Sequence, residues 1–168
     1  MQHIIDGLYL GGDESVAKAK ELGMARLCCC KDGIDSHRSM LGYTSLAAPK
    51  DKQYLVARDG NVMALNLIDV DDPTMIPDEA IDAGLRFIKE MQEKGIKILI
   101  HCNAGHSRSP SVVMAYLRAA DGMPDSFVAA KKRFKAIYRR YDPSVGIDAH
   151  IRERWKSLPE FFNKGNNG

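Results

Sequence analysis

The sequence predicts an α/β fold with a central, mostly parallel sheet that is flanked by helices on both faces. Short apolar runs typical of buried strands alternate along the chain with segments whose apolar residues recur at helical spacing. Glycine, proline and acidic residues separate these segments. The length of 168 residues suits a single domain with one core. We assign this domain to residues 1–162.

The first half of the chain predicts fewer elements than the second. The predicted elements are a first strand at 4–11, a helix at 14–22, a buried strand at 24–30 and a short strand near 54–57. Gly7 interrupts the first strand, and Asp13 is placed to cap the helix. No periodicity is sustained elsewhere between residues 31 and 61, so we expect loops there.

The second half predicts a regular succession of strands and helices. These are a strand at 62–70, a helix from Pro77 that ends before Gly95, a strand at 96–100, and helices at 110–120, 126–138 and 147–156. Pro77 is a residue type favoured at the first position of a helix, and Gly95 is one favoured just after its end. The tail at 163–168 has little to bury, so we expect it to be disordered.

Composition and charge indicate which binding partners and which cellular location to expect. Lys and Arg total 24 against 22 for Asp and Glu, a net charge of +2 that is too small for a protein whose main task is to coat nucleic acid. No apolar stretch approaches the roughly 20 residues of a membrane span, and the start does not resemble a signal peptide. We therefore expect a cytoplasmic monomer with no nucleic-acid partner and no stable membrane insertion.

The four cysteines favour reduced thiols over a metal site or a disulfide scaffold. Cys28, Cys29 and Cys30 are consecutive, and neighbouring strand residues point to opposite faces, so this triplet cannot chelate a metal as a C-x-x-C pair does. Cys102 stands alone. We expect neither metal nor cofactor.

Residues 100–110, which read IHCNAGHSRSP, lie between a predicted buried strand and a predicted helix. Such a loop directs successive backbone N–H groups and the positive end of the helix toward one point, which makes it a cradle for an anion. The same donors stabilise a thiolate, so Cys102 is a candidate nucleophile. Arg108 can grip two phosphate oxygens with its planar guanidinium. Ser109 can donate its hydroxyl to the sulfur.

The run H-C-x-x-G-x-S-R-S at 101–109 resembles the signature H-C-x-x-G-x-x-R-S/T of cysteine-dependent protein tyrosine phosphatases, in their small dual-specificity form. Residues 5–11, IDGLYLG, look like the opening of dual-specificity domains, and 123–140 resemble the helix after their phosphate loop. The segment from 32 to about 61 is longer than in a minimal member. In such proteins this region often shapes the substrate mouth.

The resemblance implies a dual-specificity phosphatase fold and a reaction in two steps. Cys102 attacks phosphorus, and water then hydrolyses the phosphocysteine, with one carboxyl acting first as acid and then as base. The implied substrate is a phosphorylated protein or peptide, with phosphotyrosine foremost and phosphoserine and phosphothreonine also accepted. The residues implied to bind it are Asn103, Ala104, Gly105, His106, Ser107 and Arg108, with His101 in a supporting role.

The acid is expected on the loop after the strand that ends near residue 70. Asp72 is favoured by forward counting along that strand and by a following Ile-Pro like that in the acid loop of some relatives. Asp71 is favoured instead by counting back from Phe87 without gaps. Asp69 ranks third.

Two alternative functions stay open. A phosphoinositide or other phospholipid phosphatase is one, although relatives of the phosphatase-and-tensin kind have lysines where this cradle has Asn103, Ala104 and His106. A likeness of the acid loop to mitochondrial phosphatidylglycerophosphate phosphatases supports that alternative. The other is a phosphopeptide-binding pseudophosphatase, a class that usually lacks the cysteine, the arginine or the acid.

Two further features carry hypotheses. If the strand with Cys29 and Cys30 lies beside the one that leads to Cys102, as the resemblance implies, a protective disulfide with Cys102 can form. The densest basic cluster is either a solvated helix face or a local field that attracts phosphorylated or membrane-bound substrate. Its residues are Lys131, Lys132, Arg133, Lys135, Arg139 and Arg140.

Overall fold

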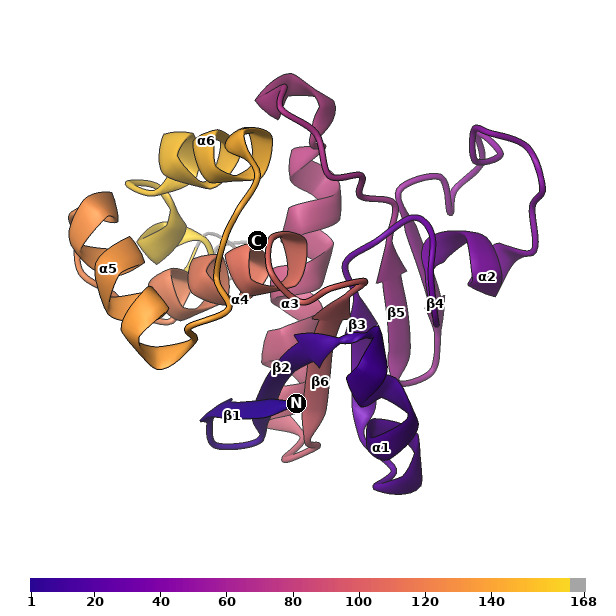
Figure 1. The fold of residues 1–168 in the computed structure, drawn as a ribbon, viewed down its shortest axis with the longest axis horizontal. Helices are drawn as coiled ribbons and strands as arrows, with labels where there is room; N and C mark the ends of the chain where they lie inside the picture. The colour runs from indigo at the N-terminus through magenta and orange to yellow at the C-terminus, as the bar shows by residue number, and fades with distance from the viewer. Residues whose placement is uncertain (164–168) are drawn as a thin grey trace.

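A computed structural model describes residues 1–163, and these residues form one six-stranded sheet with helices packed against it (Figure 1). The strands are β1 (Gln2–Ile5), β2 (Leu8–Gly12), β3 (Ala25–Cys28), β4 (Val56–Asp59), β5 (Val62–Leu65) and β6 (Ile98–Cys102). The helices are α1 (Val16–Glu21), α2 (His37–Leu41), α3 (Asp78–Glu93), α4 (Arg108–Ala119), α5 (Phe127–Ile137) and α6 (Val145–Arg154). Short 3₁₀ turns are η1 (Asp13–Ser15), η2 (Pro73–Met75) and η3 (Leu158–Glu160). Apart from Asn163, the tail expected to be disordered lies outside the described residues.

The strand order is β1-β2-β6-β3-β5-β4. The four central strands are parallel, and the two edge strands β1 and β4 pair antiparallel with their neighbours. This arrangement confirms the predicted mostly parallel sheet. β6 lies between β2 and β3, where Cys102 pairs with Gly12 and His101 with Cys28. The carboxyl end of β6 is therefore held by hydrogen bonds on both sides.

Helices cover both faces of the sheet, also as predicted. Val16 of α1 packs with Leu99 of β6 in a small buried cluster on one face. On the other face α3 lies close to the strands, because Gly84 has no side chain between its backbone and Leu65 of β5 and Val112 of α4. Figure 1 shows α4, α5 and α6 grouped on the left of the view, away from α1 and α2.

The amino-terminal part differs from the prediction in two ways. The stretch predicted as one strand is a hairpin of β1 and β2, because Gly7 adopts φ +70° and reverses the chain. Asp13 does not cap the following helix, which begins with the 3₁₀ turn η1 before α1. The Asp13 side chain instead lies beside His101 and Asn103.

The middle of the chain also differs. The predicted strand at 62–70 ends at Leu65, because the next residues make other contacts: Asn66 N–H donates to the carbonyl of Leu55, and the Leu67 carbonyl accepts from Lys31 and Arg108. The predicted buried strand at 24–30 likewise ends at Cys28. Helix α2, capped by the Ser36 side chain, lies where loops were expected.

The remaining elements follow the prediction closely. β4 lies two residues later than expected, and α6 two residues earlier. Pro77 occupies the cap position of α3 rather than its first turn. None of the helices within residues 1–163 is both long enough and apolar enough to cross a membrane.

Three histidines, His37, His101 and His150, are buried within this fold. Desolvation lowers the pKa of each, although nearby acceptors oppose the effect: a backbone carbonyl for His37, Asp13 for His101 and Asp78 for His150. The folded protein therefore holds these side chains neutral at pH values where the unfolded chain already binds protons.

Stability is accordingly expected to fall as the pH drops below about 6.5, the ordinary pKa of histidine, because protonation then favours the unfolded chain. Urea-unfolding midpoints measured from about pH 7.5 down to about pH 5.5 should decrease steadily. A His150→Gln variant, which removes one titrating group, should show a shallower decrease. Midpoints that stay constant or rise over this range would contradict the assignment.

Candidate active site

The loop of residues 103–107 joins the end of β6 to the start of α4 and forms one wall of a pocket of about 370 Å³. The chain reaches this pocket from three separate segments. Its lining residues are Asp69, Cys102, Asn103, Ala104, His106, Ser107, Arg108, Asp142, Pro143 and Ser144. The structure thus brings the predicted nucleophile, the predicted arginine and one of the three candidate acids to one place.

Four consecutive carbonyls of this loop accept hydrogen bonds from outside it. The partners, in order along the loop, are Asp13 N–H to Asn103 (2.9 Å), Arg140 Nη2 to Ala104 (2.5 Å), Tyr138 OH to Gly105 (2.8 Å) and Asp142 N–H to His106 (2.8 Å). In a trans peptide the N–H points opposite to the C=O. The N–H groups of 104–107 therefore point away from these partners, and they donate to none of the described residues. This is the arrangement that the predicted anion cradle requires.

Gly105 is required by a close approach of the cradle to the sheet. Its φ is +69°, and a Cβ there would lie 2.6 Å from the carbonyl carbon and oxygen of Gly11 at the end of β2. Any other residue would strain the backbone and push the loop away from β2. The glycine of the signature thus fixes the depth at which the cradle lies.

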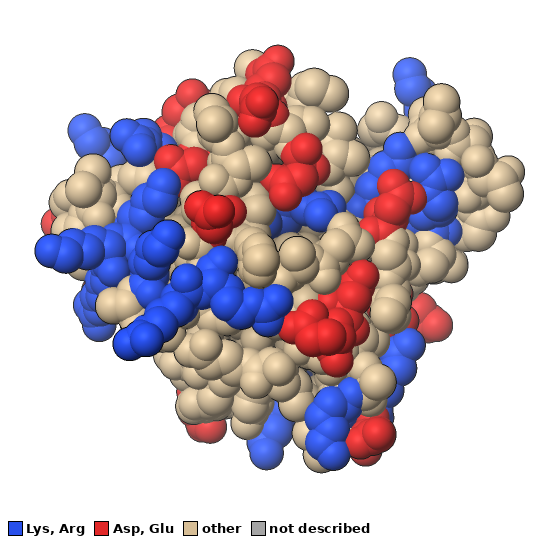
Figure 2. Space-filling model, in the orientation of Figure 1, with Lys and Arg blue, Asp and Glu red and all other residues tan. Residues whose placement is uncertain are grey.

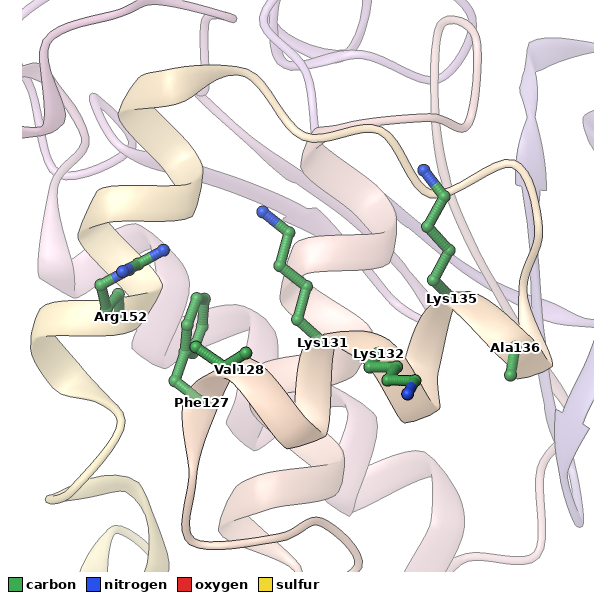
Figure 3. A pocket seen from close by; sticks show the side chains of 7 residues that line it. All are labelled: Phe127, Val128, Lys131, Lys132, Lys135, Ala136 and Arg152. Carbon is green, nitrogen blue, oxygen red and sulfur yellow. The ribbon is translucent and has the colours of Figure 1, made fainter.

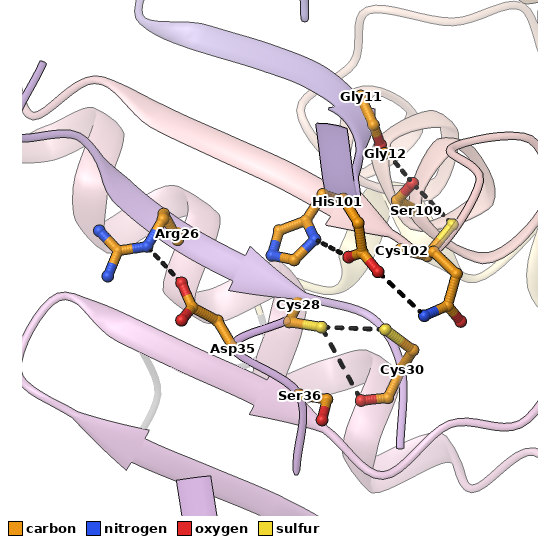
Figure 4. A network of polar contacts seen from close by, with 12 residues as sticks. Gly11, Gly12, Arg26, Cys28, Cys30, Asp35, Ser36, His101, Cys102 and Ser109 are labelled. Carbon is orange, nitrogen blue, oxygen red and sulfur yellow. Dashed lines mark hydrogen bonds and ion pairs between the residues drawn. The ribbon is translucent and has the colours of Figure 1, made fainter. Parts of the chain in front are cut away.

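Cys102 lies at the floor of the pocket and is 2% exposed. Ser109 Oγ is 3.2 Å from Cys102 Sγ and 3.4 Å from the Gly11 carbonyl, so its proton can be donated to either (Figure 4). The N-terminus of α4, which begins at Arg108, adds its positive end to the same place. The sulfur is surrounded by groups that favour negative charge.

Arg108 is held by two hydrogen bonds and one ion pair. Its Nη2 donates to Asn103 Oδ1 (2.8 Å), its Nη1 donates to the Leu67 carbonyl (3.2 Å), and its Nε lies 3.9 Å from Asp69 Oδ2. The Asn103 amide in turn donates to the Asp32 carbonyl at 2.7 Å. These contacts fix the guanidinium at the edge of the pocket. Through Asn103 they also connect it to the long segment that begins near residue 32.

The three candidate acids differ in their contacts. Asp69 accepts a hydrogen bond from Ser107 Oγ (2.9 Å), and Ser107 Oγ also accepts from the Ser144 N–H. Asp72 turns toward η2, where Thr74 N–H and Oγ1 donate to it at 2.9 and 2.7 Å and lower the pKa of its carboxyl.

Asp71 is the least constrained of the three. Its side chain forms no hydrogen bond or ion pair with residues 1–163. Its backbone is fixed against α6: a Cβ on Gly146 would lie 2.2 Å from the carbonyl oxygen of Val70 and 3.1 Å from the carbonyl carbon of Asp71. Neither Asp71 nor Asp72 lines the pocket itself.

His101 is fully buried, with its Nδ1 3.3 Å from Asp13 Oδ1, and Asp13 Oδ2 accepts from Asn103 Nδ2 at 3.2 Å (Figure 4). Desolvation lowers the pKa of His101, which suits a neutral supporting residue. Asp13 thus joins β2 to the cradle, a role that the sequence did not predict, because it predicted a helix cap there.

No cluster of three or more His, Cys, Asp or Glu side chains that suits a metal ion occurs within residues 1–163.

Tyr138, Arg140 and Asp142 also belong to the site but were not predicted as site residues. Arg140 entered only as one member of the basic cluster, and nothing in the local sequence distinguishes the three. His106 lines the pocket, consistent with the predicted substrate contact.

The strand with the cysteine triplet does lie beside β6, as the hypothesis of a disulfide requires. Cys29 N–H donates to the His101 carbonyl at 2.7 Å. Cys30 Sγ contacts Cys28 Sγ at 3.0 Å (Figure 4). Burial raises the pKa of the Cys29 thiol, and the nearby Cys102 raises that pKa further. The disulfide with Cys102 stays a prediction.

Comparison with known proteins agrees with this geometry. The family model described as the dual specificity phosphatase catalytic domain matches residues 45–139. The chain belongs to the dual specificity phosphatase family. Within it, the chain is 30% identical to the dual specificity protein phosphatase PHS1 of Arabidopsis thaliana over 86% of its own length and 14% of that protein.

Other relatives in the family match over most of the chain. The human serine/threonine/tyrosine-interacting protein is 29% identical over 91% of this chain and 63% of its own length. The chain therefore spans less than two thirds of both of these curated relatives. The crystal structure of DUSP15 superimposes with a TM-score of 0.66 over 100% of this chain and 97% of that one, at 19% identity, which shows a shared fold.

The hydrogen bond from Tyr138 is expected to matter for anion binding, because it holds the Gly105 carbonyl away from the pocket. A Tyr138→Phe variant should bind tungstate or phosphate about two- to tenfold more weakly, the usual worth of one hydrogen bond, in calorimetric titrations. Tyr116→Phe, which removes the hydroxyl of a tyrosine that does not contact the cradle, serves as the matched control. Equal affinities for Tyr138→Phe and the unmodified protein would contradict this role.

Proposed function

We propose that this chain hydrolyses phosphate monoesters of proteins, with phosphotyrosine foremost and phosphoserine and phosphothreonine also accepted, through a phosphocysteine intermediate. The observation that carries the proposal is the convergence of three features on one pocket: the Cys102 sulfur, the inward N–H groups of 104–107 and the Arg108 guanidinium. A sulfur nucleophile and oxyanion donors in one pocket suit transfer of a phosphoryl group. Membership of the dual specificity phosphatase family supports the same reaction.

In the first step the substrate phosphate binds in the cradle, and the Cys102 thiolate attacks phosphorus. The S–P bond forms, the P–O ester bond breaks, and an acid gives its proton to the leaving oxygen. In the second step water attacks the phosphocysteine, the S–P bond breaks, and the same carboxylate accepts the proton from water. The N–H groups and Arg108 stabilise the charge on the equatorial oxygens in both steps.

Ser109 acts in the second step. Its hydroxyl lies 3.2 Å from the sulfur, so it can donate a hydrogen bond to the thiolate that leaves. A charge-assisted bond of this kind makes sulfur a better leaving group. Release of inorganic phosphate then restores the starting state.

We infer that Asp71 is the acid, which reverses the order favoured by the sequence. A general acid needs freedom to reach the leaving oxygen, and it must hold a proton. Asp72 accepts hydrogen bonds from Thr74 that lower the pKa of its carboxyl, and the Asp69 carboxylate is held by a hydrogen bond from Ser107. Asp71 has no such bond and lies on a backbone fixed by α6.

The two alternative functions, a phosphopeptide-binding pseudophosphatase and a phospholipid phosphatase, are supported by no observation of comparable weight. The chain has both the cysteine and the arginine in contact with the cradle, whereas a binding-only relative usually lacks one of the catalytic groups. The pocket lining contains Arg108 but no lysine, so a second or third phosphate of an inositol headgroup would find little compensating charge.

Hydrolysis of a phosphotyrosine peptide and of p-nitrophenyl phosphate tests both the reaction and the acid. Asp71→Asn should lower kcat on the peptide by about 100-fold or more, because the missing proton limits departure of the leaving group. Asp72→Asn should stay within a factor of about three. Cys102→Ser, which lacks the proposed nucleophile, should be inactive and serves as the negative control.

Two outcomes would contradict these assignments. A loss of about 100-fold in Asp72→Asn with little change in Asp71→Asn would overturn the choice of acid. Turnover by Cys102→Ser equal to that of the unmodified protein would overturn the phosphocysteine route itself.

A further inference from the structure

A second concave surface lies on α5 and α6, outside the catalytic pocket. It has a volume of about 500 Å³ and an apolar floor with basic side chains around it (Figure 3). Its lining residues, hereafter the α5 groove, are Phe127, Val128, Lys131, Lys132, Lys135, Ala136 and Arg152. Val128 is 69% exposed, so the α5 groove offers an apolar contact beside its basic side chains.

The charges of the α5 groove are only partly compensated. Asp148 pairs with Lys131 at 2.5 Å and with Arg152 at 3.4 Å, and the Arg152 guanidinium lies 4.9 Å from the centre of the Phe127 ring. Lys132 and Lys135 form no ion pair with any residue in the described part of the chain. Four cations against one carboxylate leave a net positive charge beside an apolar floor.

The α5 groove is connected to the catalytic pocket through the end of its own helix. α5 ends at Ile137, and Tyr138 and Arg140 directly after it bind carbonyls of the cradle. Figure 2 shows Lys and Arg side chains covering the α5 side of this face and continuing toward its centre. An extended chain with its phosphorylated residue in the pocket can therefore follow a basic path to the groove.

We propose that the α5 groove docks an acidic segment of the protein substrate, on the same polypeptide as the phosphorylated residue, an inference that rests on the function proposed above. Carboxylates of that segment pair with Lys132 and Lys135, and an interleaved apolar side chain packs on Val128 and Phe127. Attraction of this kind raises the association rate and selects among phosphorylated sites of equal chemistry.

A peptide fits this surface better than an anionic membrane. The basic residues surround a hollow, whereas a bilayer is flat on this scale and would contact the rim. Figure 2 also shows Asp and Glu side chains on the same face, which would repel anionic lipid headgroups held against it. A peptide can place its carboxylates on the lysines alone.

The test compares two phosphotyrosine peptides that differ only in the segment that would reach the α5 groove, which carries glutamates in one peptide and glutamines in the other. The unmodified protein should have a kcat/KM about tenfold higher for the acidic peptide at low salt, and added salt should reduce the difference. Lys132→Glu/Lys135→Glu should lose this preference while turnover of p-nitrophenyl phosphate stays unchanged.

Lys94→Glu/Lys97→Glu is the matched control, because it changes net charge equally but lies before β6, at the end of that strand opposite Cys102. The control should keep the preference for the acidic peptide. Equal kcat/KM for both peptides in the unmodified protein, or an unchanged preference in Lys132→Glu/Lys135→Glu, would overturn the docking role.

Binding measurements separate a failure of docking from a failure of catalysis. Fluorescence anisotropy with the acidic peptide carrying unmodified tyrosine should show binding to the unmodified protein and several-fold weaker binding to Lys132→Glu/Lys135→Glu, even if no peptide is hydrolysed. Absence of such binding would overturn the proposal. The proposal would also be overturned if the protein sedimented with phosphatidylserine vesicles through Lys132 and Lys135 and yet showed no preference between the two peptides.

Discussion

The outward direction of four consecutive carbonyls in the loop after β6 is the constraint on which the site depends. Each carbonyl is held by a different residue: Asp13 from the turn after β2, and Tyr138, Arg140 and Asp142 from the segment after α5. Because the peptide plane is rigid, holding the oxygens outward holds the N–H groups inward. The fold thus fixes a set of anion donors before any anion is present, which is the condition for strong electrostatic stabilisation.

The same loop links catalysis to the long segment that follows β3. Asn103 accepts from Arg108 with its oxygen and donates to the Asp32 carbonyl and to Asp13 with its nitrogen. The position of the guanidinium is therefore coupled to residues that belong to neither β6 nor α4. A change in the segment from residue 32 onward can reach Arg108 through this one amide.

The sequence was most informative where structure is local. The loop after β6 and helix α3 depend on residues close together in the chain, and both were predicted. The hairpin of β1 and β2 was not predicted, because a lone glycine such as Gly7 is equally typical of an interruption within one strand. Predicting the roles of Asp13 and Tyr138 requires knowing which distant segments meet the loop. The proposed order of the acids depends on hydrogen bonds from Ser107 and Thr74, which spacing does not reveal.

The central claim is that Cys102 accepts a phosphoryl group within the cradle. The most direct measurement is mass spectrometry of protein mixed with a phosphotyrosine peptide and quenched in acid within the first turnover. The account predicts one phosphoryl group on the proteolytic fragment that contains Cys102, and none on that fragment from Cys102→Ser. Hydrolysis of the peptide with no phosphoryl group on Cys102 at any time in the first turnover, or with one on another residue instead, would contradict it.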